Sequence, residues 1–169
     1  LNMLQKNYQI IEFVAGKFIN IARLNKFGYT KQDFMDYGDM IVNSLDDSIF
    51  TIEKVVKMNI PSNIDELGFD SKFYESIIKF SNSFDYTYFN NKVIFVKKGK
   101  RLSRLALLEE ILNVYEKMEM DELIEYLHIN YGIETSALKI KEIIKDTTIY
   151  YDSIMETVYK NYNVYYEEI

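Results

Sequence analysis

The 169-residue sequence predicts an α+β fold that is mainly α-helical and carries a small β-hairpin. Apolar residues recur every three to four positions over most of the chain, which is the period of an amphipathic helix. Two runs rich in β-branched and aromatic residues flank Asn90 and Asn91, and Asn tolerates the left-handed backbone of a hairpin turn. Only one Pro and six Gly occur, so we expect short turns between the regular elements.

Residues 1–28 predict one amphipathic N-terminal helix. Tyr8, Ile11, Val14 and Phe18 follow one another at spacings of three to four residues and would share one face of it. A glycine near the end of this segment is the expected stop. Because the sequence does not begin with Met, we expect this helix to continue an upstream region.

Residues 29–101 predict a first module. Thr30 is expected to cap a long helix, with Asp33 at the third helical position. A short extended segment and a brief helix ended by Pro61 should follow. Asp70 is expected to cap the next helix, and the hairpin then closes the module. The order is helix, short strand, helix, helix, hairpin, which is the connectivity of a winged helix, a helix-turn-helix core of three helices with a β-hairpin wing.

Residues 102–169 predict a second module of the same kind. Ser103 and Asp121 are the expected caps of its first two helices. The segments ESIIKF of the first module and KEIIKD of the second share the triplet IIK. A duplicated small domain explains this match, although two helices that share a triplet by chance would also produce it.

The C-terminal part of this second module predicts a degenerate wing and a helical tail. Met155, Tyr159, Tyr162 and Tyr166 follow helical spacing, so a helix is expected to replace the hairpin. A tyrosine stripe of this period packs against a neighbouring element more often than it stacks on bases or on a partner. The whole chain is therefore expected to form tandem winged helix-turn-helix modules.

A resemblance to a known group supports this prediction. The segment EKMEMDELIEYLHINYGIETSALKIKEIIKD combines a D-E-L-x-x-x-L helix, a Y-G-I turn and a second helix. It resembles the HARE-HTH group of winged helices, which includes the N-terminal domain of the bacterial RNA polymerase delta subunit. The segment IDELGFDSKFY looks similar to winged-helix segments that accompany sigma-factor-like regulators of low-GC bacteria. The resemblance covers residues 31–169 and implies a role in transcription or in other DNA-linked machinery, with no catalytic residues.

Charge is distributed unevenly along the chain. Residues 1–48 are near balance, residues 49–101 carry a net charge of +3, and residues 102–169 carry a net charge of −8. A basic middle and an acidic end suggest two surfaces with different partners.

The composition argues against an enzyme. Cysteine is absent, which removes disulfides, thiol nucleophiles and thiolate metal sites, and His128 is the only histidine. Adjacent acids such as Glu109 and Glu110 point about 100° apart on a helix and do not converge. No glycine-rich phosphate loop occurs either. We therefore expect no catalytic residues, no metal and no cofactor.

The candidate functional residues are basic. They lie on or beside the hairpin and on the helix before it, where they could bind the phosphates of double-stranded DNA: Lys72, Lys79, Lys92, Lys97, Lys98, Lys100 and Arg101. The alternative is that these lysines only block edge-to-edge aggregation of the hairpin. Nearby acidic residues would also dilute the positive field.

The function expected from these patterns is DNA-binding or transcription-associated. The first module would bind DNA through its basic wing, and the acidic second module would dock on a protein such as RNA polymerase or another subunit. The alternative is a protein–protein interaction module of a larger complex that does not contact nucleic acid. No apolar run approaches the roughly 20 residues that span a bilayer and no signal peptide is recognisable, so a cytoplasmic protein without membrane contact is expected.

Overall fold

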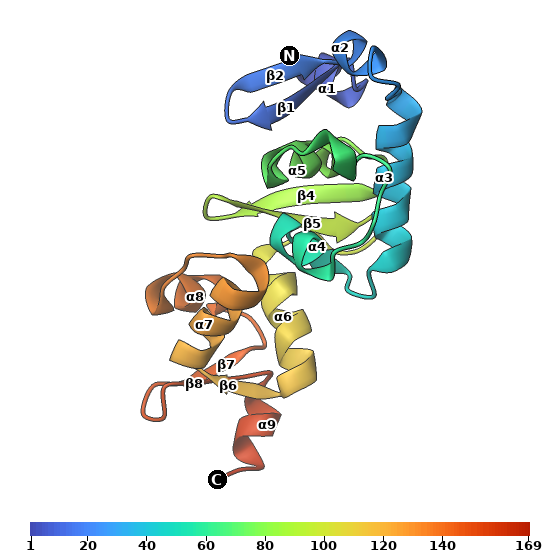
Figure 1. Cartoon of the computed structure of the whole chain (residues 1–169). Helices are drawn as coiled ribbons and strands as arrows, with labels where there is room; N and C mark the ends of the chain where they lie inside the picture. Colours follow the sequence, from blue (N-terminus) through green and yellow to red (C-terminus); the bar gives the residue numbers. More distant parts are fainter. The chain divides into compact units, whose positions relative to one another are not determined.

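The computed structural model describes residues 1–169, and the chain divides into two compact units. The first unit holds residues 1–86 and 93–100, and the second unit holds residues 87–92 and 101–169. Both combine helices with small antiparallel sheets (Figure 1), so the chain is α+β as expected. No helix in it is both long enough and apolar enough to cross a membrane.

The N-terminal segment is not one helix, so this prediction was wrong. Two short helices flank a β-hairpin, and their bounds are α1 (Asn2–Lys6), β1 (Ile10–Val14), β2 (Lys17–Asn20) and α2 (Ile21–Asn25). The turn contains Gly16 at φ +73°, a conformation that glycine adopts readily. Ile11 pairs with Ile19 across the hairpin. The β-branched and aromatic residues of both runs favour strands, and this preference outweighs the three-to-four spacing.

The remainder of the first unit follows the expected order of helix, strand, helix, helix and hairpin. Its elements are α3 (Lys31–Ser44), β3 (Ile49–Phe50), α4 (Ile52–Met58), the 3-10 turn η1 (Asp65–Leu67), α5 (Ser71–Lys79), and most of β4 (Phe84–Phe89) and β5 (Lys92–Lys97). The tip of the β4–β5 hairpin, residues 87–92, is assigned to the second unit. The strands lie in the order β3-β5-β4, and Phe50 pairs with Phe95. Asn90 has the left-handed φ of 52° that was expected in the hairpin turn.

Helix α3 begins as predicted. The Thr30 backbone N–H donates to Asp33 Oδ2 at 2.7 Å, within a complete capping box. Phe34 and Ile41 of this helix are fully buried. The edge of the Phe34 ring meets the Phe73 ring of α5 at a centroid distance of 6.1 Å, so an aromatic core joins the two helices.

The second unit has the same order of elements. They are α6 (Arg104–Tyr115), β6 (Lys117–Glu119), α7 (Met120–Tyr131), α8 (Ala137–Ile144), β7 (Tyr150–Asp152), β8 (Thr157–Tyr159) and α9 (Tyr162–Tyr166). The strands lie in the order β6-β8-β7. Ser103 accepts a hydrogen bond from the Ala106 N–H at 2.9 Å and caps α6 as predicted.

The prediction of a degenerate second wing was wrong. Strands β7 and β8 form a hairpin in which Tyr151 pairs with Val158. Asp152 Oδ1 accepts hydrogen bonds from the N–H groups of Ile154 and Met155, at 2.8 and 3.2 Å, and so holds the turn. Only the five residues of α9 form the expected helical tail. The tyrosine spacing could not distinguish these alternatives, because aromatic residues also favour strands.

Candidate functional site

The seven predicted DNA-binding cations are divided between the two units. The first unit holds Lys72, Lys79, Lys97, Lys98 and Lys100, and the second unit holds Lys92 and Arg101.

Most of these cations are engaged within their unit. Lys98 Nζ lies 2.5 Å from Asp85 Oδ1, and Arg101 Nη1 lies 2.9 Å from Glu109 Oε2. Lys97 Nζ donates to the main-chain carbonyl of Leu45. Exposed ion pairs are weak, so a phosphate could replace these carboxylates. Each pair is nevertheless neutral as a whole, which lowers the attraction that the hairpin exerts on DNA at a distance.

The two cations of α5 are also engaged. Lys72 Nζ lies 2.8 Å from Glu75 Oε1 and 3.7 Å from Glu12 Oε2, and Lys79 Nζ lies 4.6 Å from the centre of the Tyr86 ring. On α5, Lys72 is thus paired with carboxylates, whereas Lys79 lies against an aromatic ring and keeps its positive charge.

The N-terminal hairpin covers α5. Figure 1 shows β1 and β2 above this helix, and the Tyr8 hydroxyl donates to the Ile77 carbonyl of α5 at 2.9 Å. The Glu12 N–H donates to Ser76 Oγ at 3.3 Å. Glu75 and Ser76 are only 7% and 4% exposed. These two side chains of α5 therefore cannot reach a base in this arrangement.

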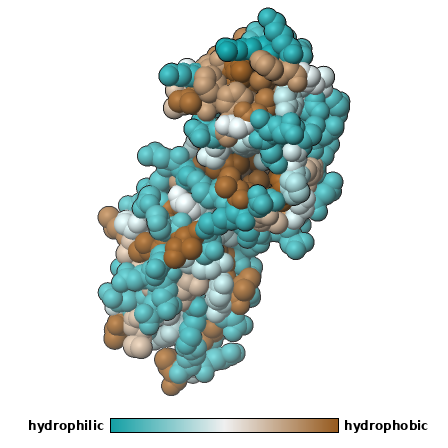
Figure 2. All heavy atoms as spheres, in the orientation of Figure 1, coloured by the Kyte–Doolittle hydropathy of each residue, from teal (hydrophilic) through white to brown (hydrophobic).

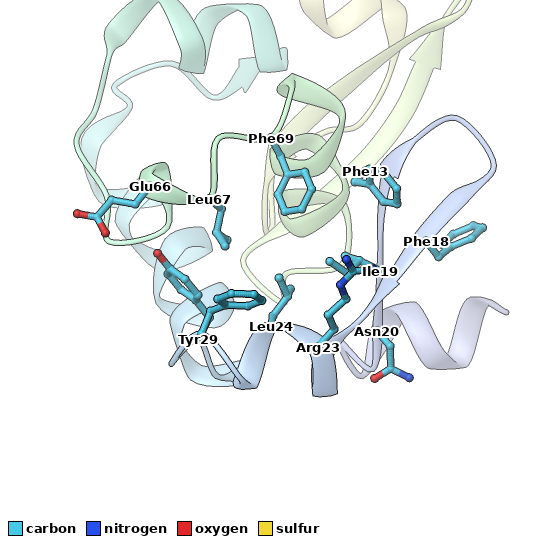
Figure 3. Close-up of a pocket in the computed structure, with 11 residues that line it drawn as sticks. Phe13, Phe18, Ile19, Asn20, Arg23, Leu24, Tyr29, Glu66, Leu67 and Phe69 are labelled. Atoms are coloured by element: carbon cyan, nitrogen blue, oxygen red, sulfur yellow. The ribbon is translucent and has the colours of Figure 1, made fainter.

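An apolar pocket of about 780 Å³ lies in the first unit (Figure 3). Strands β1 and β2, helix α2 and the loop after it form one side, and η1 with Phe69 forms the other. Its lining residues are Phe13, Phe18, Ile19, Asn20, Arg23, Leu24, Phe27, Tyr29, Glu66, Leu67 and Phe69. Figure 2 shows apolar residues at the surface over this N-terminal hairpin.

The pocket wall is anchored to the core. The Phe69 ring stacks on the Phe73 ring at a centroid distance of 4.4 Å, and Phe73 is fully buried. The centroid of the Phe13 ring, on β1, lies 5.6 Å from the centroid of the Phe69 ring. Leu24 is 2% exposed, whereas Phe27 at the rim is 72% exposed. A firm apolar floor with an open aromatic rim can bind a large apolar group.

The pocket carries one cation. Arg23 extends from α2 among the apolar side chains in Figure 3, and no ion pair of the structure involves it. In the same view the Glu66 carboxylate points away from Leu67 and Phe69. The Asn20 side chain accepts the Ala22 N–H at 2.8 Å and caps α2, which sets the direction of the helix that carries Arg23.

Sequence reasoning did not find this pocket. Its lining comes from segments about 40 to 50 positions apart, and the assumption of one N-terminal helix placed Phe18 on a helical face with Tyr8, Ile11 and Val14. The aromatic residues around the Ala-Gly turn were the available signal, because such residues favour strands.

The one histidine of the chain is paired with a glutamate at the surface. His128 Nδ1 lies 2.8 Å from Glu134 Oε1, and both side chains are more than half exposed. No group of three or more His, Cys, Asp and Glu side chains could hold a metal ion. Burial raises the pKa of the Tyr8 and Tyr37 hydroxyls above the ordinary tyrosine range, but both lie in the core.

No family model matches this chain, and no curated protein and no solved structure matches it.

Proposed function

We propose that the chain is a non-enzymatic, tandem winged-helix protein that works as a protein-binding module, with the aromatic pocket of the first unit as its principal binding site. The order of elements and the order of strands in both units support the winged-helix interpretation. The transcription-associated role that the resemblance implies belongs to this proposal as its biological setting.

One observation carries the choice of protein over DNA. In helix-turn-helix proteins the second helix of the motif enters the major groove. In the first unit this helix is α5, and the N-terminal hairpin covers it. The pocket beside it is open, and its volume of about 780 Å³ falls within the range of ligand sites.

Selection from a displayed library of random peptides tests this proposal. We expect wild type to enrich peptides with large apolar residues, and Phe27→Ala to enrich none of them, because Phe27 forms the exposed rim of the pocket. Tyr166→Ala, which removes an aromatic side chain 65% exposed in the second unit, is the matched control and should behave as wild type. Equal enrichment by wild type and Phe27→Ala would overturn the assignment of this site.

DNA binding by the second unit is the second candidate function. Its helix α8 has no covering hairpin, and Lys141 and Lys145 are exposed on and just after it. The net charge of −8 over residues 102–169 opposes this candidate. Fluorescence anisotropy with a labelled duplex at about 50 and about 200 mM salt tests whether the second unit binds DNA. Binding through phosphate contacts should weaken steeply over this range of salt. Binding that disappears in Lys141→Ala would support it.

A further inference from the structure

We infer that the occupant of the aromatic pocket is an acidic segment of a partner protein, bound in extended form along the free edge of β2 with one large apolar side chain inserted into the pocket. This inference rests on the proposed function and specifies the chemistry and the conformation of the partner. Three features of the first unit carry it: the charge around the pocket, the edge of the hairpin, and the shape of the pocket.

Charge on the side of the pocket that residues 1–31 form favours an acidic partner. The one acid among the lining residues, Glu66, belongs to the opposite side, and its carboxylate points away from Leu67 and Phe69 (Figure 3). Residues 1–31 contain five Lys or Arg and one acidic residue, a net of +4 in a chain whose total is −6. The one acid, Glu12, accepts the Gly16 N–H at 2.8 Å and lies 3.7 Å from Lys72 Nζ. Arg23 in the pocket lining has no carboxylate of its own. Its guanidinium can therefore form a bidentate pair with a carboxylate from outside.

The hairpin edge favours an extended partner. Strand β2 pairs with β1 alone, in a sheet of two strands. In an antiparallel pair, alternate residues of the edge strand direct their N–H and C=O groups outward. Three residues at this edge, Phe18, Ile19 and Asn20, also line the pocket. A peptide that adds to β2 would therefore place alternate side chains at the pocket, which is how β-augmentation combines affinity with specificity.

The pocket shape favours a side chain over a nucleobase. Aromatic rings beside cations also occur where single-stranded nucleic acids stack. Here, however, Ile19, Leu24 and Leu67 form much of the wall, and Arg23 is the one cation among the lining residues. The polar edge of a base would lose its hydrogen bonds against such a wall, and a phosphate backbone needs a row of cations. A Phe or Leu side chain has no polar group that would lose a hydrogen bond there.

A set of short fluorescent peptides tests the inference by anisotropy. The acidic probe has one Phe flanked by Asp and Glu, the neutral probe replaces those acids with Asn and Gln, and the basic probe replaces them with Lys. We expect the acidic probe to bind wild type at least tenfold more tightly than the neutral probe. Arg23→Glu should remove this preference and favour the basic probe instead. Lys145→Glu, an exposed cation of the second unit, is the matched control and should leave the order unchanged.

The extended conformation is tested separately. N-methylation of the acidic probe at alternate backbone positions removes the N–H groups that would pair with β2, and we expect at least tenfold weaker binding in one of the two methylation frames only. Equal affinity in both frames would overturn the β2-edge mode.

The failure of the inference differs from the failure of the proposed function. Equal binding of acidic, neutral and basic probes overturns the inference while the pocket remains a protein-binding site. Binding of none of the probes, together with no enrichment from the peptide library, overturns both. Displacement of the acidic probe by single-stranded oligothymidine, with direct oligothymidine binding that Phe27→Ala abolishes, would show that the pocket binds nucleic acid instead. Thermal unfolding followed by circular dichroism confirms that each variant is folded.

Discussion

The two units share the order of their elements but differ at one helix. Both place the first strand beside the third, in the orders β3-β5-β4 and β6-β8-β7. Helix α5 of the first unit is covered, and its Glu75 and Ser76 are 7% and 4% exposed. Helix α8 occupies the corresponding place in the second unit, and its Leu138 is 69% exposed. The difference shows that the N-terminal hairpin buries part of α5 and forms one side of a pocket, whereas α8 has no such cover.

The shared IIK triplet lies at the same place in both units. Ile78 and Ile144 are buried in the last turn of α5 and α8. Phe84 begins β4 six positions after Ile78, and Tyr150 begins β7 six positions after Ile144. Duplication of a small domain remains a prediction, and these matched positions allow the two units to be compared residue by residue.

The largest expected effects test the likeness of the two units. We expect Ile78→Ala and Ile144→Ala each to lower the free energy of unfolding by about 2–5 kcal/mol, because each removes buried methyl groups and leaves a cavity. Urea unfolding followed by circular dichroism measures both. An effect below about 1 kcal/mol at only one position would show that the triplets are not structurally equivalent.

A smaller effect tests the difference between the units. Ser76 and Glu142 are equivalent by the triplet alignment, but Ser76 lies beneath β1 whereas Glu142 is exposed. We expect Ser76→Leu to destabilise the first unit by about 1–3 kcal/mol, because the larger side chain does not fit under the hairpin. Glu142→Leu should change the free energy of unfolding by less than about 0.5 kcal/mol. Limited proteolysis should cleave the N-terminal hairpin faster in Ser76→Leu alone.

The buried tyrosines of the first unit predict a dependence of stability on pH. Burial raises the pKa of Tyr8 and of Tyr37 in the folded state above their value in the unfolded chain. The folded state therefore favours the protonated hydroxyls, and this preference contributes to the free energy of unfolding. The contribution is fully present below the pKa of the unfolded chain, about 10. It is lost as the pH rises towards the pKa of the folded state, because the unfolded chain releases its protons first. Denaturant unfolding at about pH 9 and about pH 11 measures this loss. We expect the free energy of unfolding to fall by up to about 1.4 kcal/mol per pH unit for each tyrosine.

The double variant Tyr8→Phe, Tyr37→Phe supplies the control for this pH dependence. It should be less stable at neutral pH, because the Tyr8 hydroxyl no longer donates to the Ile77 carbonyl. Its loss of stability between the two alkaline conditions should be smaller than that of wild type. An equal loss would assign the alkaline transition to other tyrosines.

The smallest expected effect concerns the predicted basic wing. Lys98→Ala removes an exposed ion pair with Asp85, and we expect less than about 1 kcal/mol of destabilisation, decreasing further at high salt. If the wing binds DNA, the same variant also lowers the salt dependence of duplex binding by about one phosphate contact. If Lys98→Ala does not change the affinity for duplex DNA, the role of Lys98 is to block edge-to-edge aggregation of the hairpin.

Local signals predicted much of the helical framework. The capping box at Thr30, the Ser103 cap and the left-handed Asn90 turn each depend on side chains within a few positions of one another. Such interactions can be identified from residue type and spacing alone. The α-helical period failed in residues 1–28 and after Tyr150, because Ile, Val, Phe and Tyr satisfy both the helical and the strand pattern over short runs.

The candidate site was less predictable than the framework. The sequence was enough to name the seven basic residues. It could not show which carboxylates and carbonyls they contact, because several of these groups lie elsewhere in the chain. Lys97 and its acceptor Leu45 are 52 positions apart in the sequence. The aromatic pocket was missed because its two sides lie on separate elements that meet only after folding.

Residue type and spacing along the chain determined the caps of α3 and α6 and the turn of the β4–β5 hairpin, since these depend on neighbours in sequence. Only the tertiary structure decided that α5 is covered, that Lys72 lies near Glu12 as well as Glu75, and that an open pocket lies beside the helix. The contacts responsible join residues 64 and 69 positions apart, from Glu12 to Ser76 and from Tyr8 to Ile77. Burial and charge pairing are properties of such distant contacts, so no local pattern could specify them.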